Sequence, residues 1–315
     1  MIGTRGSSLA LWQANHVQDA LKASRSDLEV CLKIIRTKGD EALDGPFHVT
    51  LDKGLFTRKI EEALLAGAID LAVHSLKDLP TELPDGLTLA AITSRQDPAD
   101  VLVSKDGQIL KTLGDGAEVL TGSLRRRAQL LHRRPNLRVS SVRGNVETRL
   151  MKLSECEAQA IVLARAGLVR LGLGERVTER LDPAQFVPAC GQGALAIETR
   201  CDDLSMREML HSLDDLESRR YVTAERAFLA TLEGGCQVPI GAYARGTPGG
   251  ETLTLTGMVA NLDGSRLLQK TIAAAVTGAE AAKELGQRLA EELRNDGAME
   301  ILDEVTNLSQ SQESW

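Results

Sequence analysis

The sequence predicts an α/β fold that gives way, in its last third, to a small α+β domain with an antiparallel sheet. Over the first two-thirds of the 315 residues, strand and helix signals alternate. Such alternation implies parallel sheets joined by crossover helices. After about residue 218 the pattern changes to a helix, two strands joined by a hairpin turn, and a long amphipathic helix. The Ser-Arg-Gln-Asp-Pro stretch at residues 94–98 interrupts the alternation and indicates a crossing between domains.

The elements of the alternating part follow from the spacing of apolar residues. Ala10, Ala14, Val17 and Leu21 recur at helical spacing and predict a helix over residues 9–23. Residues 69–74 read IDLAVH, a run typical of a buried strand. By the same reasoning we expect helices at 55–66, 124–133, 146–153 and 167–171, and strands at 29–36, 87–93, 118–121, 137–142 and 160–164.

The last third is built differently. A helix over residues 218–232 ends at two glycines. Strands at 252–260 and 266–274 flank the turn Asn261-Leu262-Asp263-Gly264, which is typical of a hairpin. A long amphipathic helix covers 279–295.

Composition excludes several classes of protein. With 43% hydrophobic and 26% charged residues, the chain has the make-up of a folded globular protein, and its length exceeds what one core usually holds. Eight aromatic residues are few for a nucleic-acid surface built on stacking. No apolar run is long enough to cross a bilayer, and the N-terminus lacks a signal-like apolar core. Five widely spaced cysteines without a C-x-x-C pair predict no metal site and a reducing cytoplasm.

Charge is distributed unevenly along the chain. The net charge is −7, which argues against general attraction to nucleic acid or anionic membranes. Residues 121–150, however, carry eight arginines and one acid, a local net charge of +7 inside a remainder of −14. We therefore expect something in this segment to meet anions.

Two motifs follow predicted strands in the first part of the chain. Arg5 and Ser7 lie in a strand-to-helix turn, where free N–H groups attract anions, although Ser7 alone would also serve as a helix cap. Lys77 and Asp78 come directly after the strand at 69–74. Ligands of parallel α/β sheets bind outside the carboxyl ends of strands, so Asp78 is a candidate for stabilising a cation or moving protons. A solvated Lys-Asp loop is the alternative.

A third motif repeats the pattern in the arginine-rich segment. Residues 121–127 read TGSLRRR after a strand, and Arg143-Gly144-Asn145 closes the next strand, with Arg149 on the helix after it. Guanidinium groups bind carboxylates or phosphates in a bidentate manner. Ser123 could be only a helix cap, and charge runs are usually solvated, but arginines at two successive strand ends favour an anion site.

The fourth motif is a cysteine on a loop, Cys236, after Gly234-Gly235. A single cysteine is most often a small buried apolar residue. A thiol on a glycine-rich loop is alternatively a nucleophile or a covalent anchor. None of the five histidines lies near Cys236 in the sequence, which disfavours a protease-like Cys–His pair.

Taken in order, these segments resemble the porphobilinogen deaminases. The matching pieces are TRGSSLALWQA, KGLF, AVHSLKDLP, GSLRRRAQL, VRGNVETRL, PACGQGA, VTAERAF and LEGGCQVPIG, which span residues 4 to 241. The resemblance implies two α/β domains like those of type II periplasmic binding proteins around a cleft, and a small α+β C-terminal domain with an antiparallel sheet. Their expected bounds are 1–95 with 194–214, 96–193, and 215–315.

The resemblance also implies the reaction. A dipyrromethane cofactor is attached to the cysteine of GGCQVP, here Cys236. Four porphobilinogen molecules are added to it with loss of ammonia, and hydrolysis then releases hydroxymethylbilane, a precursor in haem and tetrapyrrole biosynthesis. The implied enzyme is a cytoplasmic monomer that acts on a small molecule, without nucleic acid or membrane.

Residue roles follow from the same resemblance. Asp78 and Lys77 are the expected catalytic residues, and both also contact the cofactor. The other expected cofactor ligands are Cys236, Thr121, Ser123, Arg125, Arg126, Arg143, Gly144 and Asn145. The expected substrate ligands are Arg5, Ser7, Lys53, Arg149 and Arg170. One departure is that the family's glycine-rich loop before KGLF is replaced here by HVTLDK, in which Lys53 is the one lysine.

Two other functions fit parts of the sequence. An anion-binding protein on the same two-domain frame, without turnover, would explain the arginines but needs neither Asp78 nor Cys236. A nucleic-acid-binding protein would use the segment from Arg125 to Arg149, and its binding would depend strongly on salt. The acidic remainder and the few aromatic residues disfavour the second alternative.

Overall fold

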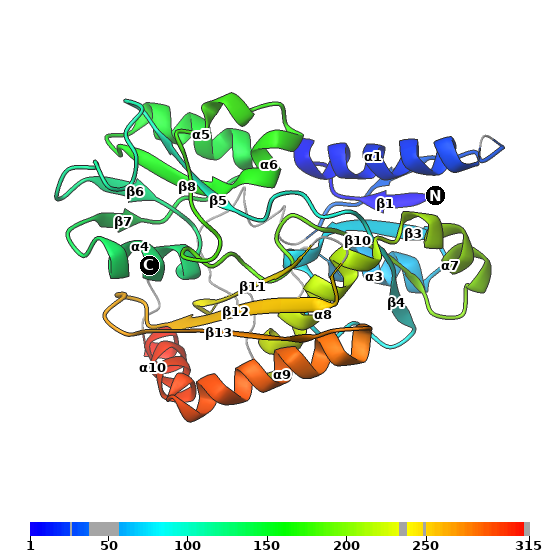
Figure 1. The fold of residues 1–315 in the computed structure, drawn as a ribbon. Helices are drawn as coiled ribbons and strands as arrows, with labels where there is room; N and C mark the ends of the chain where they lie inside the picture. Colours follow the sequence, from blue (N-terminus) through cyan, green and yellow to red (C-terminus); the bar gives the residue numbers. More distant parts are fainter. Residues whose placement is uncertain (26, 38–56, 233–237, 248–249, 312–315) are drawn as a thin grey trace. The chain divides into compact units, whose positions relative to one another are not determined.

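The computed structural model describes residues 1–315 except 26, 38–56, 233–237, 248–249 and 312–315 (Figure 1). The chain forms two compact units. The first unit is Met1–Gln96 with Gly193–Arg219, and the second is Asp97–Gln192 with Arg220–Trp315. No helix in the described part of the chain is both long and apolar enough to span a membrane.

The first unit contains a five-stranded sheet in the order β2-β1-β3-β10-β4. β1 pairs in parallel with β2 and β3, whereas β10 pairs antiparallel with β3 and β4. The strands are β1 (Ile2–Thr4), β2 (Leu32–Ile34), β3 (Leu71–Ser75), β4 (Leu87–Ile92) and β10 (Leu195–Arg200). The helices are α1 (Ser8–Ser24), α3 (Arg58–Leu65) and α7 (Leu204–Leu210), with 3₁₀ turns η1 (Leu76–Asp78) and η3 (His211–Leu213).

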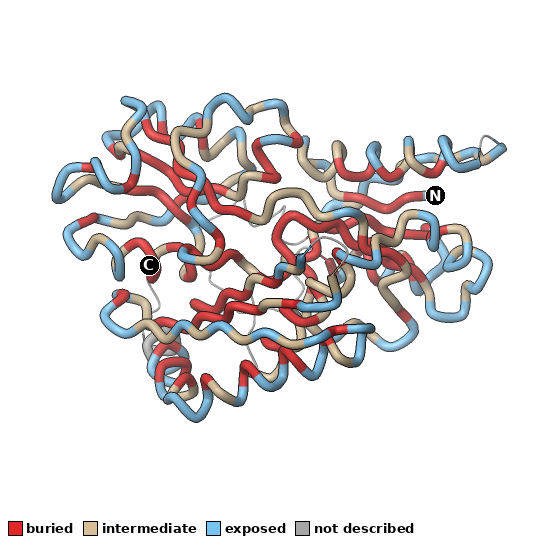
Figure 2. Tube along the Cα trace, in the orientation of Figure 1, coloured by how far each residue is buried: buried red, intermediate tan, exposed pale blue. Residues whose placement is uncertain are grey.

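Side chains of β3 alternate between the two covered faces of this sheet. Leu71 and Val73 pack with the core that α1 and α7 cover, while Ala72 packs with α3 on the other face. The alternation follows from the two-residue period of a strand. It places His74 on the α3 side. The residues Leu71–His74 of β3 are all buried, and Figure 2 colours such buried stretches of the chain red.

The second unit begins with another five-stranded sheet, in the order β7-β6-β8-β5-β9. β6 pairs in parallel with β7 and β8, and β5 pairs antiparallel with β8 and β9. The strands are β5 (Asp100–Ser104), β6 (Glu118–Leu120), β7 (Arg138–Ser140), β8 (Ala160–Ala164) and β9 (Glu179–Arg180). Helix α4 (Leu124–Arg133) covers one face, α5 (Val146–Glu155) and α6 (Arg165–Arg170) cover the other, and a 3₁₀ turn η2 (Gly174–Arg176) follows.

The second unit also holds a three-stranded antiparallel sheet, β11 (Ile240–Gly246), β12 (Thr252–Ala260) and β13 (Leu267–Ala275). Helices α8 (Leu216–Thr231), α9 (Ala279–Asn295) and α10 (Ala298–Ser311) share one core with it, centred on the fully buried Phe228. The buried Glu225 of α8 fixes this sheet to the turn at Gly191 that follows β9, because its carboxylate accepts hydrogen bonds from Gly191 N (2.7 Å) and Ala244 N (2.8 Å). Ala242 N also donates to Pro188 O (3.1 Å).

The predicted fold class is confirmed: alternating α/β segments precede a small antiparallel domain. The predicted strands at 29–36 and 137–142 are shorter in the structure, as β2 and β7. Strands β5 and β10 were not predicted, because each enters its sheet antiparallel from a distant part of the chain. The division into three domains stays a prediction, since the chain forms two compact units and the second contains two sheets.

A small polar cluster lies within the α3-covered face of the first sheet. His74 Nε2 and Glu198 Oε2 are 3.0 Å apart, and both side chains are buried. Glu61 of α3 is also buried against this face. Oε1 of Glu61 and Oε1 of Glu198 have no hydrogen-bond partner within the described part of the chain. Burial is the main cause that raises the pKa of Glu61, and the negative charge of Glu198 raises it further. The Thr57 hydroxyl lowers this pKa, as do the charges of His74 and Arg58 to a smaller extent, but burial outweighs them.

The first prediction concerns this buried carboxyl. The pKa of Glu61 in the folded chain lies above its ordinary value of 4.5, so the native state binds a proton that the unfolded state releases. That contribution to stability is complete below the unfolded pKa and is lost as pH rises through the raised folded pKa. We expect Glu61→Gln to flatten the fall in the urea midpoint above pH 4.5. The exposed neighbour variant Glu62→Gln is the control, and an identical slope in both variants would contradict the expectation.

The second prediction concerns the packing of α9 on α8. A Cβ at Gly286 would collide with the Ala224 carbonyl oxygen and lie 2.8 Å from both Ala227 Cβ and Phe228 N. Overpacking of this kind costs about 1–3 kcal/mol. We expect Gly286→Ala to lower the free energy of unfolding by about that amount, measured by urea denaturation. Gly278→Ala at the start of the same helix, where a Cβ meets nothing within 4 Å, is the matched control.

Candidate active site

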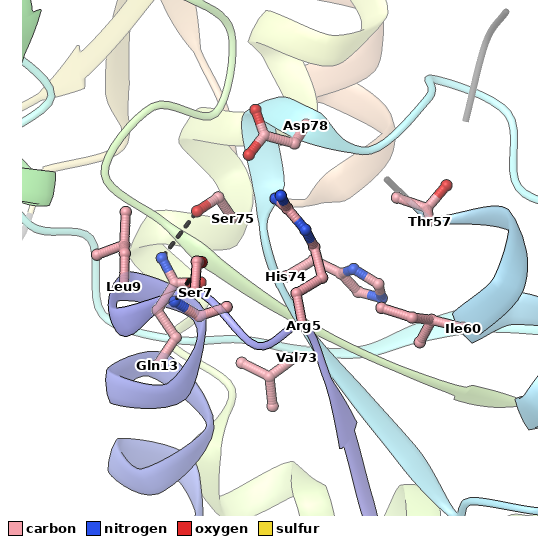
Figure 3. A pocket seen from close by; sticks show the side chains of 11 residues that line it. Arg5, Ser7, Leu9, Gln13, Thr57, Ile60, Val73, His74, Ser75 and Asp78 are labelled. Atoms are coloured by element: carbon pink, nitrogen blue, oxygen red, sulfur yellow. Dashed lines mark hydrogen bonds between the residues drawn. The ribbon is translucent and has the colours of Figure 1, made fainter. Parts of the chain in front are cut away.

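A pocket opens at the carboxyl ends of β1 and β3 in the first unit. These two strands are parallel neighbours, so the loops after them leave the sheet at the same edge. The polar residues that line the pocket are Arg5, Ser7, Gln13, Thr57, His74, Ser75 and Asp78 (Figure 3). The structure thus brings together two motifs that lie about 70 residues apart in the sequence.

Helix α1 is fixed to this edge by two side chains. Ser7 Oγ accepts a hydrogen bond from Ala10 N (3.3 Å), so Ser7 caps the helix as well as lining the pocket. The buried Gln13 donates from Nε2 to Ser75 Oγ (2.8 Å), which ties α1 to the end of β3 (Figure 3). Gln13 was not predicted as a site residue; its signal is a polar side chain on the apolar face that Ala10, Ala14 and Val17 define.

Asp78 ends the 3₁₀ turn η1 with an exposed side chain. The turn is anchored on either side, because Leu76 and Leu79 are buried and Leu76 N donates to Ala194 O (3.1 Å). Arg5 extends from the end of β1 toward Asp78 (Figure 3). A carboxylate held at a pocket mouth beside a cation is suited to stabilising positive charge and to accepting and returning protons. Lys77 of the same turn is half-buried.

The second unit presents a corresponding edge. Strands β7, β6 and β8 are adjacent and parallel, so the segments after them, 141–145, 121–123 and 165–170, leave at one edge. Two of these segments are in direct contact, since a Cβ at Gly122 would lie 2.7 Å from Val142 O. The two successive strand ends at which the sequence places arginines, those of β6 and β7, are therefore neighbours.

Two helix N-termini point from this edge. Ser123 caps α4 by accepting from Arg126 N (3.4 Å), and Asn145 caps α5 by accepting from Thr148 N (2.8 Å). Thr121 Oγ1 accepts from Ser123 N (3.3 Å). Helix N-termini favour anions, and Gly144 (φ +118°) allows the tight approach before α5, where a Cβ would lie 2.7 Å from the Thr148 side chain.

Arg125 and Arg126 meet a carboxylate of the protein itself. Asp100 Oδ2 accepts from Arg125 Nη1 (2.7 Å), and Asp100 Oδ1 accepts from Nε (3.0 Å) and Nη2 (2.8 Å) of Arg126. All three side chains are buried. Burial would raise the pKa of Asp100, but the two guanidinium groups outweigh it and hold that pKa well below its ordinary value. Asp100 was not predicted; its signal is an acid at the start of the apolar run DVLV.

The other predicted arginines differ in exposure. Arg143 is exposed and Arg149 is half-buried at the N-terminus of α5. Arg170 at the end of α6 is buried, and burial lowers the pKa of Arg170 to about 10.

At least six of the eight arginines in the segment of +7 donate to backbone carbonyl groups of the fold, Arg125 and Arg126 among them. Arg134 donates to the carbonyl groups of Leu110 (2.8 Å) and Leu113 (2.7 Å), and Arg138 donates to Gly116 O (3.0 Å). Arg127 donates to Val139 O (2.8 Å) and Arg133 to Gln185 O. Much of the hydrogen-bonding capacity of these arginines is therefore used within the fold, and that something in this segment meets anions stays a prediction.

Two predicted site residues, Cys236 and Lys53, lie outside the described residues. The four cysteines within the described part, Cys31, Cys156, Cys190 and Cys201, are free thiols. Among the described residues no group of three His, Cys, Asp or Glu side chains is arranged to hold a metal ion.

Solved structures similar to this chain include protein PG110 from Staphylococcus aureus and the methionine binding protein MetQ. PG110 has a TM-score of 0.42 and 12% identity, over 70% of this chain and 88% of that one. MetQ has a TM-score of 0.41 and 17% identity, over 67% of this chain and 88% of that one.

Sequence relatives match over nearly the whole chain. A porphobilinogen deaminase from Syntrophobacter fumaroxidans is 50% identical over 304 residues, which are 96% of this chain and 97% of that protein. A porphobilinogen deaminase from Syntrophotalea carbinolica is 52% identical over 301 residues, covering 96% and 94%. The family model "Porphobilinogen deaminase, dipyromethane cofactor binding domain" matches residues 1–208, and the model of the deaminase C-terminal domain matches 219–295. With both models matched in order and half of its residues shared with these relatives, the chain belongs to the porphobilinogen deaminase family.

Proposed function

We propose that, in the porphobilinogen deaminase reaction of this chain, Asp78 is the catalytic residue and the arginine-bearing edge of the second unit holds the carboxylates. The observation that carries the proposal is the exposed carboxylate of Asp78 at the pocket mouth, with Arg5 extending toward it (Figure 3). An anion-binding protein without turnover has no use for a carboxylate at that point.

The second edge suits the dipyrromethane cofactor that the family carries. The acetate and propionate groups of such a cofactor need cations and N–H donors. Arg143 is exposed, Arg149 is half-buried, and the N-termini of α4 and α5 add positive potential. When bound, the cofactor supplies the pyrrole carbon to which the first porphobilinogen is joined. Its proposed ligands are Lys77, Asp78, Thr121, Ser123, Arg125, Arg126, Arg143, Gly144 and Asn145, with Cys236 as the point of attachment.

Asp78 acts on the substrate. Each condensation breaks the bond between the aminomethyl carbon and nitrogen of porphobilinogen, and ammonia leaves with the bonding electrons. The positive charge left on the pyrrole is stabilised by the Asp78 carboxylate, which faces the ring N–H. A new carbon–carbon bond then forms, and the proton that the attacked ring carbon loses passes to Asp78 and on to the released ammonia.

The remaining roles concern the carboxylates of the incoming substrate. Arg5 and Ser7 line the pocket with Asp78, and Lys77 precedes Asp78 in η1. We assign these three residues, with Lys53, Arg149 and Arg170, to the acetate and propionate groups of porphobilinogen. Burial already lowers the pKa of Arg170, so a carboxylate beside it would restore a favourable environment for its charge.

We further infer a cytoplasmic monomer that acts without nucleic acid. The four described cysteines are free thiols, which is typical of a reducing compartment. The net charge of −7 disfavours attraction to nucleic acid.

The third prediction tests the covalent attachment. Intact mass spectrometry of the purified chain should show an adduct of two pyrrole units, and Cys236→Ser should abolish the adduct because serine forms no thioether. Cys201→Ser, an exposed free thiol elsewhere, should keep it. An unmodified but active chain, or an adduct that survives in Cys236→Ser, would refute the assignment.

The fourth prediction tests the catalytic carboxylate. Asp78→Asn should keep the two-pyrrole adduct yet lower kcat by about 10²–10⁴-fold, since the amide neither offsets positive charge nor accepts the proton. Asp78→Glu, which keeps the carboxylate, should recover part of the loss. Asp85→Asn, an exposed acid on the turn before β4, is the control. Near-normal turnover in Asp78→Asn would remove Asp78 from the catalytic role.

A further inference from the structure

The buried ion-pair cluster of Asp100, Arg125 and Arg126 carries unequal charge. One carboxylate faces two guanidinium groups, at 2.7 Å from Arg125 and 2.8 Å from Arg126, so the cluster keeps a formal charge of +1. The relative exposures of Arg125 and Arg126 are 4% and 5%, and that of Asp100 is 0%. In such surroundings water screens charge weakly, and the balance between these three groups sets the local potential.

The donors of the two arginines are not used equally. Arg126 makes four hydrogen bonds: besides Asp100 it donates to Val162 O (3.1 Å) and to Gln192 Oε1 (3.4 Å). Arg125 donates twice from Nη1, to Asp100 and to Val187 O (2.6 Å). Within the described part of the chain, both hydrogen bonds of its side chain come from that one nitrogen. Arg125 is therefore the arginine of the pair that makes fewer hydrogen bonds to the protein.

Asp100 itself is held rigidly. Gln192 Nε2 donates to Asp100 Oδ1 (2.9 Å) and to Pro98 O (2.7 Å), which fixes the start of β5. The Arg125 side chain also lies against β11, since a Cβ at Gly241 would be 3.1 Å from Arg125 Cδ. Gly241 follows Cys236 by five residues in the sequence.

We propose that Asp100 is a positioning residue that halves the charge of the Arg125–Arg126 pair, so that pyrrole carboxylates bind there and can leave again. This inference rests on the proposed function, in which these arginines contact the carboxylates. Each porphobilinogen brings two carboxylates, and one Asp78 serves every condensation. The growing chain must therefore shift relative to Asp78 after each addition, so the cofactor carboxylates must be able to leave these arginines, and a pair with a charge of +2 would hold them too firmly.

The test is a series of variants graded by the formal charge of the cluster. Arg126→Gln has a charge of 0, the natural chain and Asp100→Asn/Arg126→Gln have +1, and Asp100→Asn has +2. Each chain is incubated with porphobilinogen, freed of unbound substrate, and its retained pyrrole units are counted by intact mass spectrometry. Retention should rise with charge, and kcat per adduct-bearing chain should fall about ten-fold in Asp100→Asn because stronger charge attraction slows exchange.

Two comparisons separate charge from folding. Asp97→Asn removes a nearby acid that pairs with Arg180 (2.6 Å) rather than with the cluster, and it should behave as the natural chain. The double variant should return pyrrole retention toward the natural value although it carries more changes than Asp100→Asn. A purely structural role of Asp100 predicts the opposite, a further loss in the double variant.

Several outcomes would overturn the proposal. The proposal fails if Asp100→Asn retains no more pyrrole units than the control Asp97→Asn. It also fails if the double variant retains as many pyrrole units as Asp100→Asn. If Asp100→Asn does not fold, Arg126→Gln provides the test. If this variant retains as many pyrrole units as the natural chain, retention does not depend on the charge of the cluster. Asp78→Asn and Cys236→Ser are run in parallel: absence of the two-pyrrole adduct from the natural chain refutes the proposed function, whereas a flat charge series with the adduct present refutes only this inference.

Discussion

Parallel pairing of neighbouring strands is the constraint on which both candidate site edges depend. β1 beside β3, and β6 between β7 and β8, bring segments far apart in the sequence to common edges. The register matters as much as the pairing, because side chains alternate between the two faces. A slip of β3 by one residue would move His74 into the apolar core under α1 and turn Val73 toward Glu198. It would also change the direction in which the turn carrying Asp78 leaves the sheet.

Much of this arrangement could be predicted from the sequence, for identifiable reasons. Strand-to-helix turns with Ser123 and Asn145 have strong local signals, since their side chains cap the helices that they precede. The position of Asp78 after a buried strand predicts its place at the sheet edge. β10 could not be predicted in the same way, because its position between β3 and β4 depends on pairing with strands more than 100 residues away.

The partner of the two central arginines was equally hidden. Asp100 and Arg126 are separated by 26 residues, and nothing local links them. Helix α4 is covered by its own sheet on one side and by β12 and β13 on the other. Charged residues in its first turn are consequently buried, whereas the one-sided pattern of a surface helix would leave them in solvent. Arginines of this run thus donate hydrogen bonds to backbone carbonyl groups and form buried ion pairs with Asp100, and in the proposed function others bind carboxylates.

The hydrogen bonds of Glu225 have a mechanical consequence. They join Glu225 of α8, Ala244 of β11 and Gly191, three residues of the second unit. α8 comes before the segment that contains Cys236, and β11 comes after it. In the proposed function, a group attached to Cys236 is therefore joined through the chain, on both sides, to the unit that carries Arg125, Arg143 and Arg149. On that proposal, the covalent link and the counter-charges of a lengthening anionic chain belong to one body.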